Sequence, residues 1–303
     1  MLKPQNTFNL VKVHLWTLPR WFAAPFFGMA AIVGALQAGG MTANSWLAVL
    51  ASLLIMAGGH SFNSLLDYAW TGLDKGLPGE RSAEKEYSRA QNLLANDILG
   101  LKAVLINALM WYFLGILVLF YLAWQTGWII LLLGFLGMLV TFWYSQSKFN
   151  WTHELALGIG IGPLPALVGM FATSPHPPWI QGILVGIPFG LVISFAGLAL
   201  DEWPDAETNL KKGVKSIVYK VWEYAIPLEW YLSSWLSIVL IYQLFLIIIG
   251  VFKPLTGLSL LTAPFFLAFF VLLKRDFTKT TRLILLTAAF YFVFLTLGQA
   301  LGN

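Results

Sequence analysis

Long apolar runs alternate with short polar loops along this chain, and no other feature restricts its possible folds as strongly. Crossing the hydrocarbon core of a membrane takes a helix of about 20 mostly apolar residues. Nine runs reach that length, at residues 19–37, 45–66, 101–123, 127–145, 154–173, 179–200, 225–251, 255–273 and 283–301. Only 11% of the residues are charged, against about 25% in a soluble domain. We therefore predict an all-α, polytopic membrane protein with nine transmembrane helices, forming a single domain over residues 1–303.

The basic residues predict the orientation of these helices. Of the 18 Lys and Arg residues, all but Lys253 fall in segments on the same side of the membrane as the N-terminus. Because cytoplasmic loops carry the excess of Lys and Arg, we expect the N-terminus in the cytoplasm of a cell-membrane protein. Nine spans then place the C-terminus outside. The acidic residues lie in, or at the edge of, the same cytoplasmic segments.

Several kinds of chemistry have little or no support. The chain has no cysteine, which excludes disulfides and thiolate catalysis. The four histidines lie far apart and form no HExxH pattern, so a zinc site is not indicated. The glycine-rich stretch GIGIGP lies inside an apolar run and matches no nucleotide-binding loop, and we expect no nucleic-acid partner.

A first cluster of polar residues ends the second apolar run. Asn63 and Asp67 are four residues apart, so they share one face of a helix at its cytoplasmic end. Gly72 can end that helix and return the chain, which would bring Asp74 towards the same point. A helix end carrying solvated acids explains this cluster equally well.

A second cluster ends the sixth run. Asp201 and Asp205 repeat the spacing of four, and Pro204 should kink or restart the helix between them. Lysines follow at once, including Lys212. Carboxylates at a membrane edge are costly and usually bind something positive. Mg²⁺ bound to a phosphate group fits acids followed by lysines, although an ordinary basic loop would explain the lysines alone.

Three further features are expected on the cytoplasmic side or near it. Tyr144 and Lys148 lie four residues apart at the end of the fourth run, and Arg20 begins the first. Each fits an ordinary interfacial residue as well as a ligand-binding one. The segment 158–169 (GIGIGPLPALVG) is typical of close helix packing, and it would also let a lipid tail pass beside the backbone.

At these residues the sequence resembles the UbiA superfamily of intramembrane prenyltransferases. Members have nine helices and two Asp-rich motifs, at the cytoplasmic ends of helices two and six. The residues that match the two motifs are Asn63, Asp67, Asp74, Asp201 and Asp205. Ser64 and Asn209 stand where the family often has further acids. The DExPD form and the GP-containing fifth helix look most like the branch that prenylates dihydroxynaphthoate in menaquinone synthesis, and its archaeal relatives.

The resemblance implies Mg²⁺-dependent transfer of a prenyl group from its diphosphate to an aromatic or other lipophilic acceptor, as in quinone or related lipid biosynthesis. It implies catalytic roles for Asp67, Asp201 and Tyr144. The metal ligands implied are Asn63, Asp67, Asp74, Asp201 and Asp205, and the diphosphate-binding residues are Arg20, Asn63, Lys148 and Lys212. Aromatic residues, 16% of the chain, suit a pocket that stabilises an allylic cation.

Three other readings remain open at this point. An ion-coupled transporter could also have many spans with acids, but its acids tend to lie near the bilayer midplane. A prenyl diphosphate cyclase on the same fold would need no acceptor. A membrane scaffold without catalytic activity would bind no prenyl diphosphate.

Overall fold

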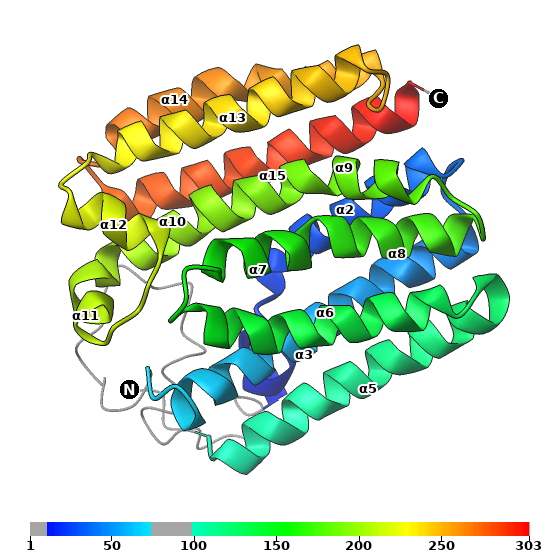
Figure 1. Ribbon diagram of the computed structural model, residues 1–303, viewed down its shortest axis with the longest axis horizontal. Coiled ribbons are helices and arrows are strands. Elements are labelled where there is room, and N and C mark those ends of the chain that lie inside the picture. The colour runs from blue at the N-terminus through cyan, green and yellow to red at the C-terminus, as the bar shows by residue number, and fades with distance from the viewer. Residues whose placement is uncertain (1–10, 74–98, 303) are drawn as a thin grey trace.

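The structure, a computed structural model, describes residues 11–73 and 99–302, apart from the side chain of Phe22. Helices account for all the regular structure in these two ranges, and their long axes run roughly side by side in Figure 1. The long helices of the first half are α2 (Ala24–Gln37), α3 (Ala43–Ala69), α5 (Leu101–Thr126), α6 (Ile129–Ser147), α7 (His153–Ile161) and α8 (Pro163–Thr173). Those of the second half are α9 (Trp179–Leu191), α13 (Leu228–Ile248), α14 (Ala263–Leu272) and α15 (Phe277–Leu301).

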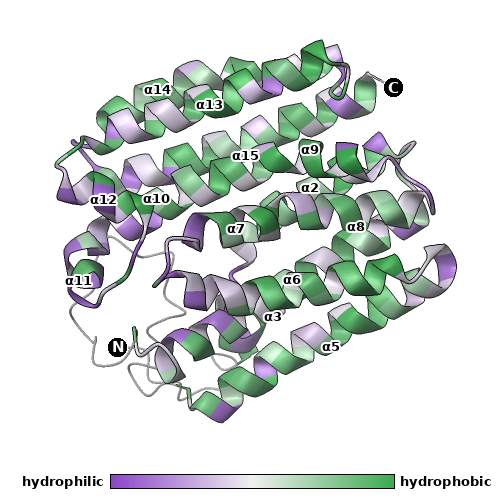
Figure 2. Ribbon diagram, viewed as in Figure 1, coloured by the Kyte–Doolittle hydropathy of each residue, from purple (hydrophilic) through white to green (hydrophobic). Residues whose placement is uncertain are grey.

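Shorter elements link these helices. They are the π-helices η1 (Val13–Thr17) and η4 (Val192–Gly197), the 3₁₀ helices η2 (Trp21–Ala23), η5 (Trp203–Asp205) and η6 (Pro254–Thr262), and the short α-helices α10 (Leu198–Glu202), α11 (Ala206–Lys211) and α12 (Ile217–Glu223). Polar residues gather at the end of the molecule where α10, α11 and α12 lie, while the long helices are mostly apolar (Figure 2).

The described residues contain eight segments long and apolar enough to cross a membrane, and the prediction of a polytopic all-α protein is confirmed. The first predicted span, residues 19–37, is not among these eight and differs in detail. Its α-helix begins only at Ala24 and is 14 residues long, because Arg20 adopts a left-handed backbone conformation with φ 53°. Pro25 then occupies the first turn, where a proline is well tolerated.

Local sequence explains where other helices begin or change. Thr42 and Ser45 form a reciprocal capping box that starts α3, and the carboxylate of Asp276 caps α15. Pro204 interrupts its helix as predicted, since the 3₁₀ segment η5 separates α10 from α11. The chain turns after α3 at Gly72, whose φ of 70° suits glycine.

Close helix contacts are made through small residues. An added Cβ on Gly34 of α2 would lie 1.9 Å from the carbonyl oxygen of Ala166 on α8, and one on Gly169 of α8 would lie 1.9 Å from that of Ala31 on α2. The two helices therefore meet backbone to backbone, as expected where the surrounding lipid provides little hydrophobic drive for helix association. Gly169 belongs to the glycine-rich stretch 158–169, so the predicted packing role of that stretch is confirmed at this residue.

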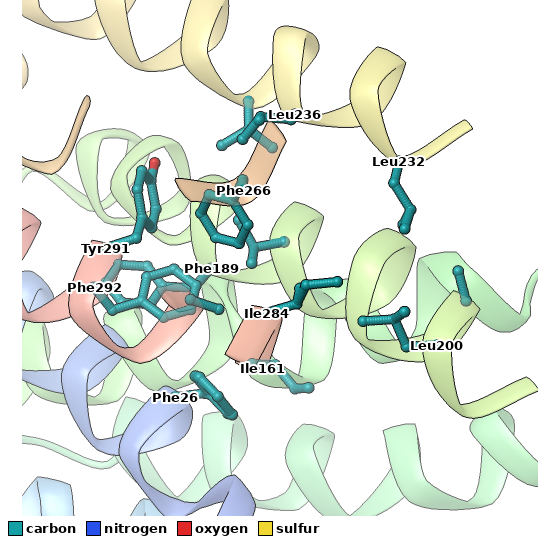
Figure 3. Packing of buried hydrophobic residues seen from close by; sticks show 14 of the residues in the cluster. Phe26, Ile161, Phe189, Leu200, Leu232, Leu236, Phe266, Ile284, Tyr291 and Phe292 are labelled. Carbon is teal, nitrogen blue, oxygen red and sulfur yellow. The ribbon is translucent and has the colours of Figure 1, made fainter. Parts of the chain in front are cut away.

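The largest apolar cluster joins α2 and α9 to the C-terminal helices (Figure 3). The rings of Phe189 and Phe292 stack with centroids 4.5 Å apart, and Phe26 meets Phe292 edge-on at 5.6 Å. A second cluster lies among α3, α5, α6 and α8. It is built mainly from leucine and alanine side chains, and it forms the floor of the tunnel described below.

Candidate active site: a polar mouth on an apolar tunnel

The first motif lies in the last turns of α3, where Asn63 and Asp67 share a face as predicted. The amide of Asn63 donates to Oδ2 of Asp67 at 3.0 Å. The ammonium of Lys148 also binds Oδ2, at 2.6 Å, and both charged side chains are almost fully buried. A buried pair of this kind is stable only while both charges are matched. Lys148 is therefore the cation that balances Asp67 in this structure.

Residues near the end of α6 complete the surroundings of Asn63. Ser145 donates its hydroxyl to Oδ1 of Asn63 at 2.8 Å, which orients the amide so that its nitrogen points to Asp67. The ammonium of Lys148 lies 5.1 Å from the ring centroid of Tyr144. Tyr144 itself is close enough to Asp67 and to Asp201 for both carboxylates to act on it electrostatically, so it lies near both acidic motifs.

The second motif is spread over three short helical elements. Asp201 is in α10 and partly buried, while Asp205 is the last residue of η5 and buried. Asn209, where the family often has an acid, donates to Glu202 at 3.1 Å and to the hydroxyl of Tyr219 at 2.6 Å. It therefore ties α11 to both α10 and α12.

The segments that follow the two motifs are in direct contact. The ammonium of Lys212 donates to the carbonyl oxygen of Leu73 at 2.9 Å, one residue before Asp74, which lies outside the described residues. The amide of Lys215 donates to the carbonyl of Lys148 at 2.6 Å. These bonds hold the loop after motif two against both α3 and α6.

Glu154 fixes the same loop from a third direction. Its Oε1 accepts from the hydroxyl of Ser216 and from the amide of Ile217, both at 2.7 Å. Ser216 caps α12, so a buried carboxylate on α7 sets the position of the helix that follows the lysines. The sequence-based site did not include Glu154, Ser216 or Ser145.

Arg20 enters the site from the N-terminal segment. Its left-handed backbone is uncommon for a residue with a side chain and is often found at functional positions. One terminal nitrogen donates to the hydroxyl of Ser64 at 3.3 Å. Its Nε is buried without a hydrogen-bond partner among the described residues, so the guanidinium has capacity to bind a further acceptor.

A long pocket opens beside these groups, and its empty space of about 870 Å³ includes the part that is open to the outside. Arg20, Asn63 and Tyr144 line its polar mouth. Below them the lining is mostly apolar and comes from one face each of α3, α6 and the α7–α8 pair, at spacings of three and four residues. The deeper residues include Ile55, Met56, Gly137, Val140, Gly160, Leu164 and Val168. We call this pocket the tunnel.

The depth of the tunnel follows from helix geometry. On α3 its lining runs from Asn63 to Ala51, which is 12 residues or about 18 Å at a rise of 1.5 Å per residue. The floor consists of Ala51, Leu119, Leu133, Leu164 and Val168, all members of the second apolar cluster. An extended carbon chain advances roughly 1.2 Å per bond, so the tunnel is long enough for about three to four isoprene units.

The chemistry of Asp67 fits a divalent cation. Its Oδ1 is buried and has no hydrogen-bond partner among the described residues, and a carboxylate oxygen is a preferred Mg²⁺ ligand. No group of three or more His, Asp or Glu side chains close enough to hold a metal ion occurs within residues 11–73 and 99–302. The predicted set of ligands includes Asp74, which lies beyond those ranges, so the complete set remains a prediction.

One tunnel residue was missed by the sequence analysis. His60 lies one turn before Asn63 on α3 and lines the tunnel just inside its mouth. In the sequence alone, the histidines are notable only for lacking a zinc-binding pattern. Its spacing of three from Asn63 was the available signal, because residues three apart on a helix share a face.

Comparison with known proteins agrees with this architecture. The sequence model of the UbiA prenyltransferase family matches residues 22–295. The fold is similar to a solved digeranylgeranylglyceryl phosphate synthase, with 15% sequence identity, a TM-score of 0.60, and 97% of this chain and 98% of that chain covered. It is also similar to a UbiA homolog from Archaeoglobus fulgidus bound to DMAPP and Mg²⁺, with 14% identity, a TM-score of 0.52, and coverage of 92% and 98%. A search of curated proteins gave no match.

The match over most of the chain shows that this protein belongs to the UbiA prenyltransferase family. It is therefore a multi-pass membrane protein of a family of prenyl-transferring enzymes. At such low identity, the two solved structures support the fold and leave the acceptor open.

Proposed function

We propose that this protein transfers a prenyl group from a prenyl diphosphate to a lipophilic acceptor, with Mg²⁺ required for the reaction. The observation that carries the proposal is the tunnel itself. A deep apolar channel ends at a polar mouth lined by Arg20, Asn63 and Tyr144, and Asn63 is bonded to the carboxylate of Asp67. This arrangement suits a molecule with a hydrocarbon tail and a diphosphate head. The homolog from Archaeoglobus fulgidus bound to DMAPP and Mg²⁺ supports the same ligand class.

In this proposal the carboxylates hold metal and the cations hold the diphosphate. Asp67 and Asp201, with Asn63, Asp74 and Asp205, would hold Mg²⁺, which neutralises the charge that grows on the leaving diphosphate. Arg20 and Lys212 would donate to diphosphate oxygens, and Tyr144 would add a hydrogen bond.

Lys148 would have two partners in this proposal. In the structure its ammonium neutralises Asp67. If Mg²⁺ were held by Asp67, the same ammonium would be available to a diphosphate oxygen. The site therefore avoids a buried, unmatched charge in either state.

The tunnel protects the reaction from water. Its apolar walls would hold the prenyl tail, and the allylic cation left by departure of the diphosphate must be kept dry until the acceptor attacks. A depth of about 18 Å, from the helix rise, favours prenyl diphosphates of three to four isoprene units. We further propose that the mouth faces the cytoplasm, as the distribution of Lys and Arg indicates.

An assay with a panel of candidate acceptors tests the proposed reaction and identifies the acceptor. Purified protein in lipid would receive Mg²⁺, geranylgeranyl diphosphate and single acceptors, led by dihydroxynaphthoate and including a glyceryl phosphate lipid, with EDTA as control. A prenylated product that requires Mg²⁺ would support the proposal and identify the acceptor class. Release of diphosphate without such a product would favour a cyclase, and absence of any Mg²⁺-dependent binding would contradict the proposal.

A further inference from the structure

Glu154 carries a buried carboxylate that none of the proposed catalytic steps uses. It is the second residue of α7 and only 3% exposed. Its Oε1 accepts two hydrogen bonds, from the hydroxyl of Ser216 and from the amide of Ile217, both at 2.7 Å. Its Oε2 is buried without a hydrogen-bond partner among the described residues. A buried carboxylate with one unsatisfied oxygen is destabilising, and such features are expected at functional sites.

Hydrogen bonds lead from Glu154 through α12 to the second acidic motif. Ser216 is the N-cap of α12, so the two bonds of Glu154 fix the start of that helix. Tyr219, one turn further along α12 and almost fully buried, accepts from the amide of Asn209 on α11 at 2.6 Å. The same amide donates to Glu202, within the second motif, at 3.1 Å. A displacement of α12 would therefore move α11 and the end of α10, which lie beside it at one end of the molecule (Figure 1).

The loop before α12 also contacts the surroundings of the first motif. The amide of Lys215 donates to the carbonyl of Lys148 at 2.6 Å, and Lys215 directly precedes Ser216. The ammonium of Lys212 reaches the chain just after α3. Glu154 therefore anchors a loop that contains one lysine assigned to the diphosphate, Lys212, and touches the backbone of the other, Lys148.

We propose that Glu154 is a positioning residue for prenyl diphosphate binding, because it holds Lys212 and the second acidic motif at a fixed place relative to Lys148. This inference rests on the proposed prenyl transfer. Glu154 is not among the residues that line the tunnel, so it acts through the segment that it binds and does not touch the prenyl tail. A diphosphate gripped from several helices is sensitive to such an anchor, since a shift of about 1 Å in one binding group can cost up to about 100-fold in rate.

Two substitutions of Glu154 test this role in purified protein in lipid with Mg²⁺. Glu154→Leu removes both bonds to α12, and it should raise the KM for geranylgeranyl diphosphate by roughly 5- to 50-fold, as expected when a charge-assisted contact is misplaced. The KM for the acceptor should change by less than about threefold, because the acceptor is not held by these cations. Glu154→Gln keeps a side-chain oxygen that can accept both bonds, so it should return the KM for the diphosphate to within about threefold of the wild-type value.

A double variant shows whether the effect passes through Lys212. In a Lys212→Ala background, Glu154→Leu should raise the KM for the diphosphate at least about threefold less than it does alone, because part of the contact is already lost. Tyr231→Phe is the matched control. It removes a hydroxyl close enough to Glu154 to interact with it electrostatically, but it removes neither bond to α12, and it should keep the wild-type KM values.

An unchanged KM for geranylgeranyl diphosphate in Glu154→Leu would overturn the inference. Equal rises in the KM of both substrates, or full multiplication of the two effects in the double variant, would also overturn it. If Glu154→Leu does not fold, Ser216→Ala provides the test, because it removes one of the two bonds. A rise of roughly 2- to 10-fold in the same KM is then expected, and an unchanged KM would overturn the inference. Failure of the proposed function looks different, because the wild type would then form no prenylated product with any acceptor.

Discussion

Prenyl chain length should be limited by the depth of the tunnel, and Gly137 on α6 allows a direct test. Gly137 lines the tunnel seven residues from Tyr144 at the mouth, or about 10 Å of helix. A Cβ added there would meet only Ile55, at an ordinary 3.7 Å. Gly137→Leu should therefore fill the tunnel without moving backbone. The space left above it has room for about two isoprene units, since an extended chain advances roughly 1.2 Å per bond.

The size of the expected change in chain-length preference follows from steric crowding in the tunnel. A tail excluded from the tunnel enters lipid rather than water, so no hydrophobic penalty arises, whereas forcing it past the new side chain costs about 1–3 kcal/mol. At about 1.4 kcal/mol per factor of ten, the preference in kcat/KM for geranylgeranyl over geranyl diphosphate should fall roughly 5- to 150-fold.

The assay measures both diphosphates with purified protein in lipid. Leu139→Phe adds bulk at the same depth on the other side of α6, where Leu139 is 47% exposed, and should keep the wild-type preference. An unchanged preference in Gly137→Leu would refute the assignment of the prenyl tail to this tunnel.

The remaining predictions concern stability, and thermal unfolding in detergent measures all three. Lys148→Met should lower the free energy of unfolding by about 3–5 kcal/mol without Mg²⁺, because the buried carboxylate of Asp67 loses its cation. Added Mg²⁺ should restore part of that stability. Equal melting temperatures of this variant in Mg²⁺ and in EDTA would contradict the prediction. Gly34→Ala should cost about 1–3 kcal/mol, because its Cβ would lie 1.9 Å from a backbone oxygen of α8. In the control Gly28→Ala, the nearest neighbour of the added Cβ lies at 3.6 Å, so its free energy of unfolding should be unchanged or rise by up to about 1 kcal/mol. Equal losses of stability in the two variants would count against the α2–α8 contact. Ser216→Ala should cost about 0.5–2 kcal/mol through loss of a helix cap, and an unchanged melting temperature would argue against that cap.

Hydropathy was sufficient to place most of the helices. A helix in lipid must be apolar over the whole thickness of the membrane, so the run 101–123 begins at the same residue as α5. The predicted start of the first span, residue 19, was too early, because hydropathy carries no information about backbone conformation. The left-handed Arg20 and the proline that follows delay the α-helix to Ala24.

Spacing within one helix also predicted part of the site. The interval of four placed Asn63 beside Asp67, and the structure joins them by a hydrogen bond. The bonds from Ser145 to Asn63 and from Ser216 to Glu154 span 82 and 62 residues. Such contacts depend on how the helices pack, which periodicity within a single helix does not determine.

If the two acidic motifs serve Mg²⁺-dependent prenyl transfer, removing one carboxylate from either motif should abolish turnover. Diphosphate release and prenylated product would be measured for the wild type, Asp67→Asn and Asp201→Asn, each in lipid and each confirmed to be folded and inserted. We expect Mg²⁺-dependent turnover by the wild type and loss of turnover in both variants. Wild-type turnover in either folded variant would contradict it.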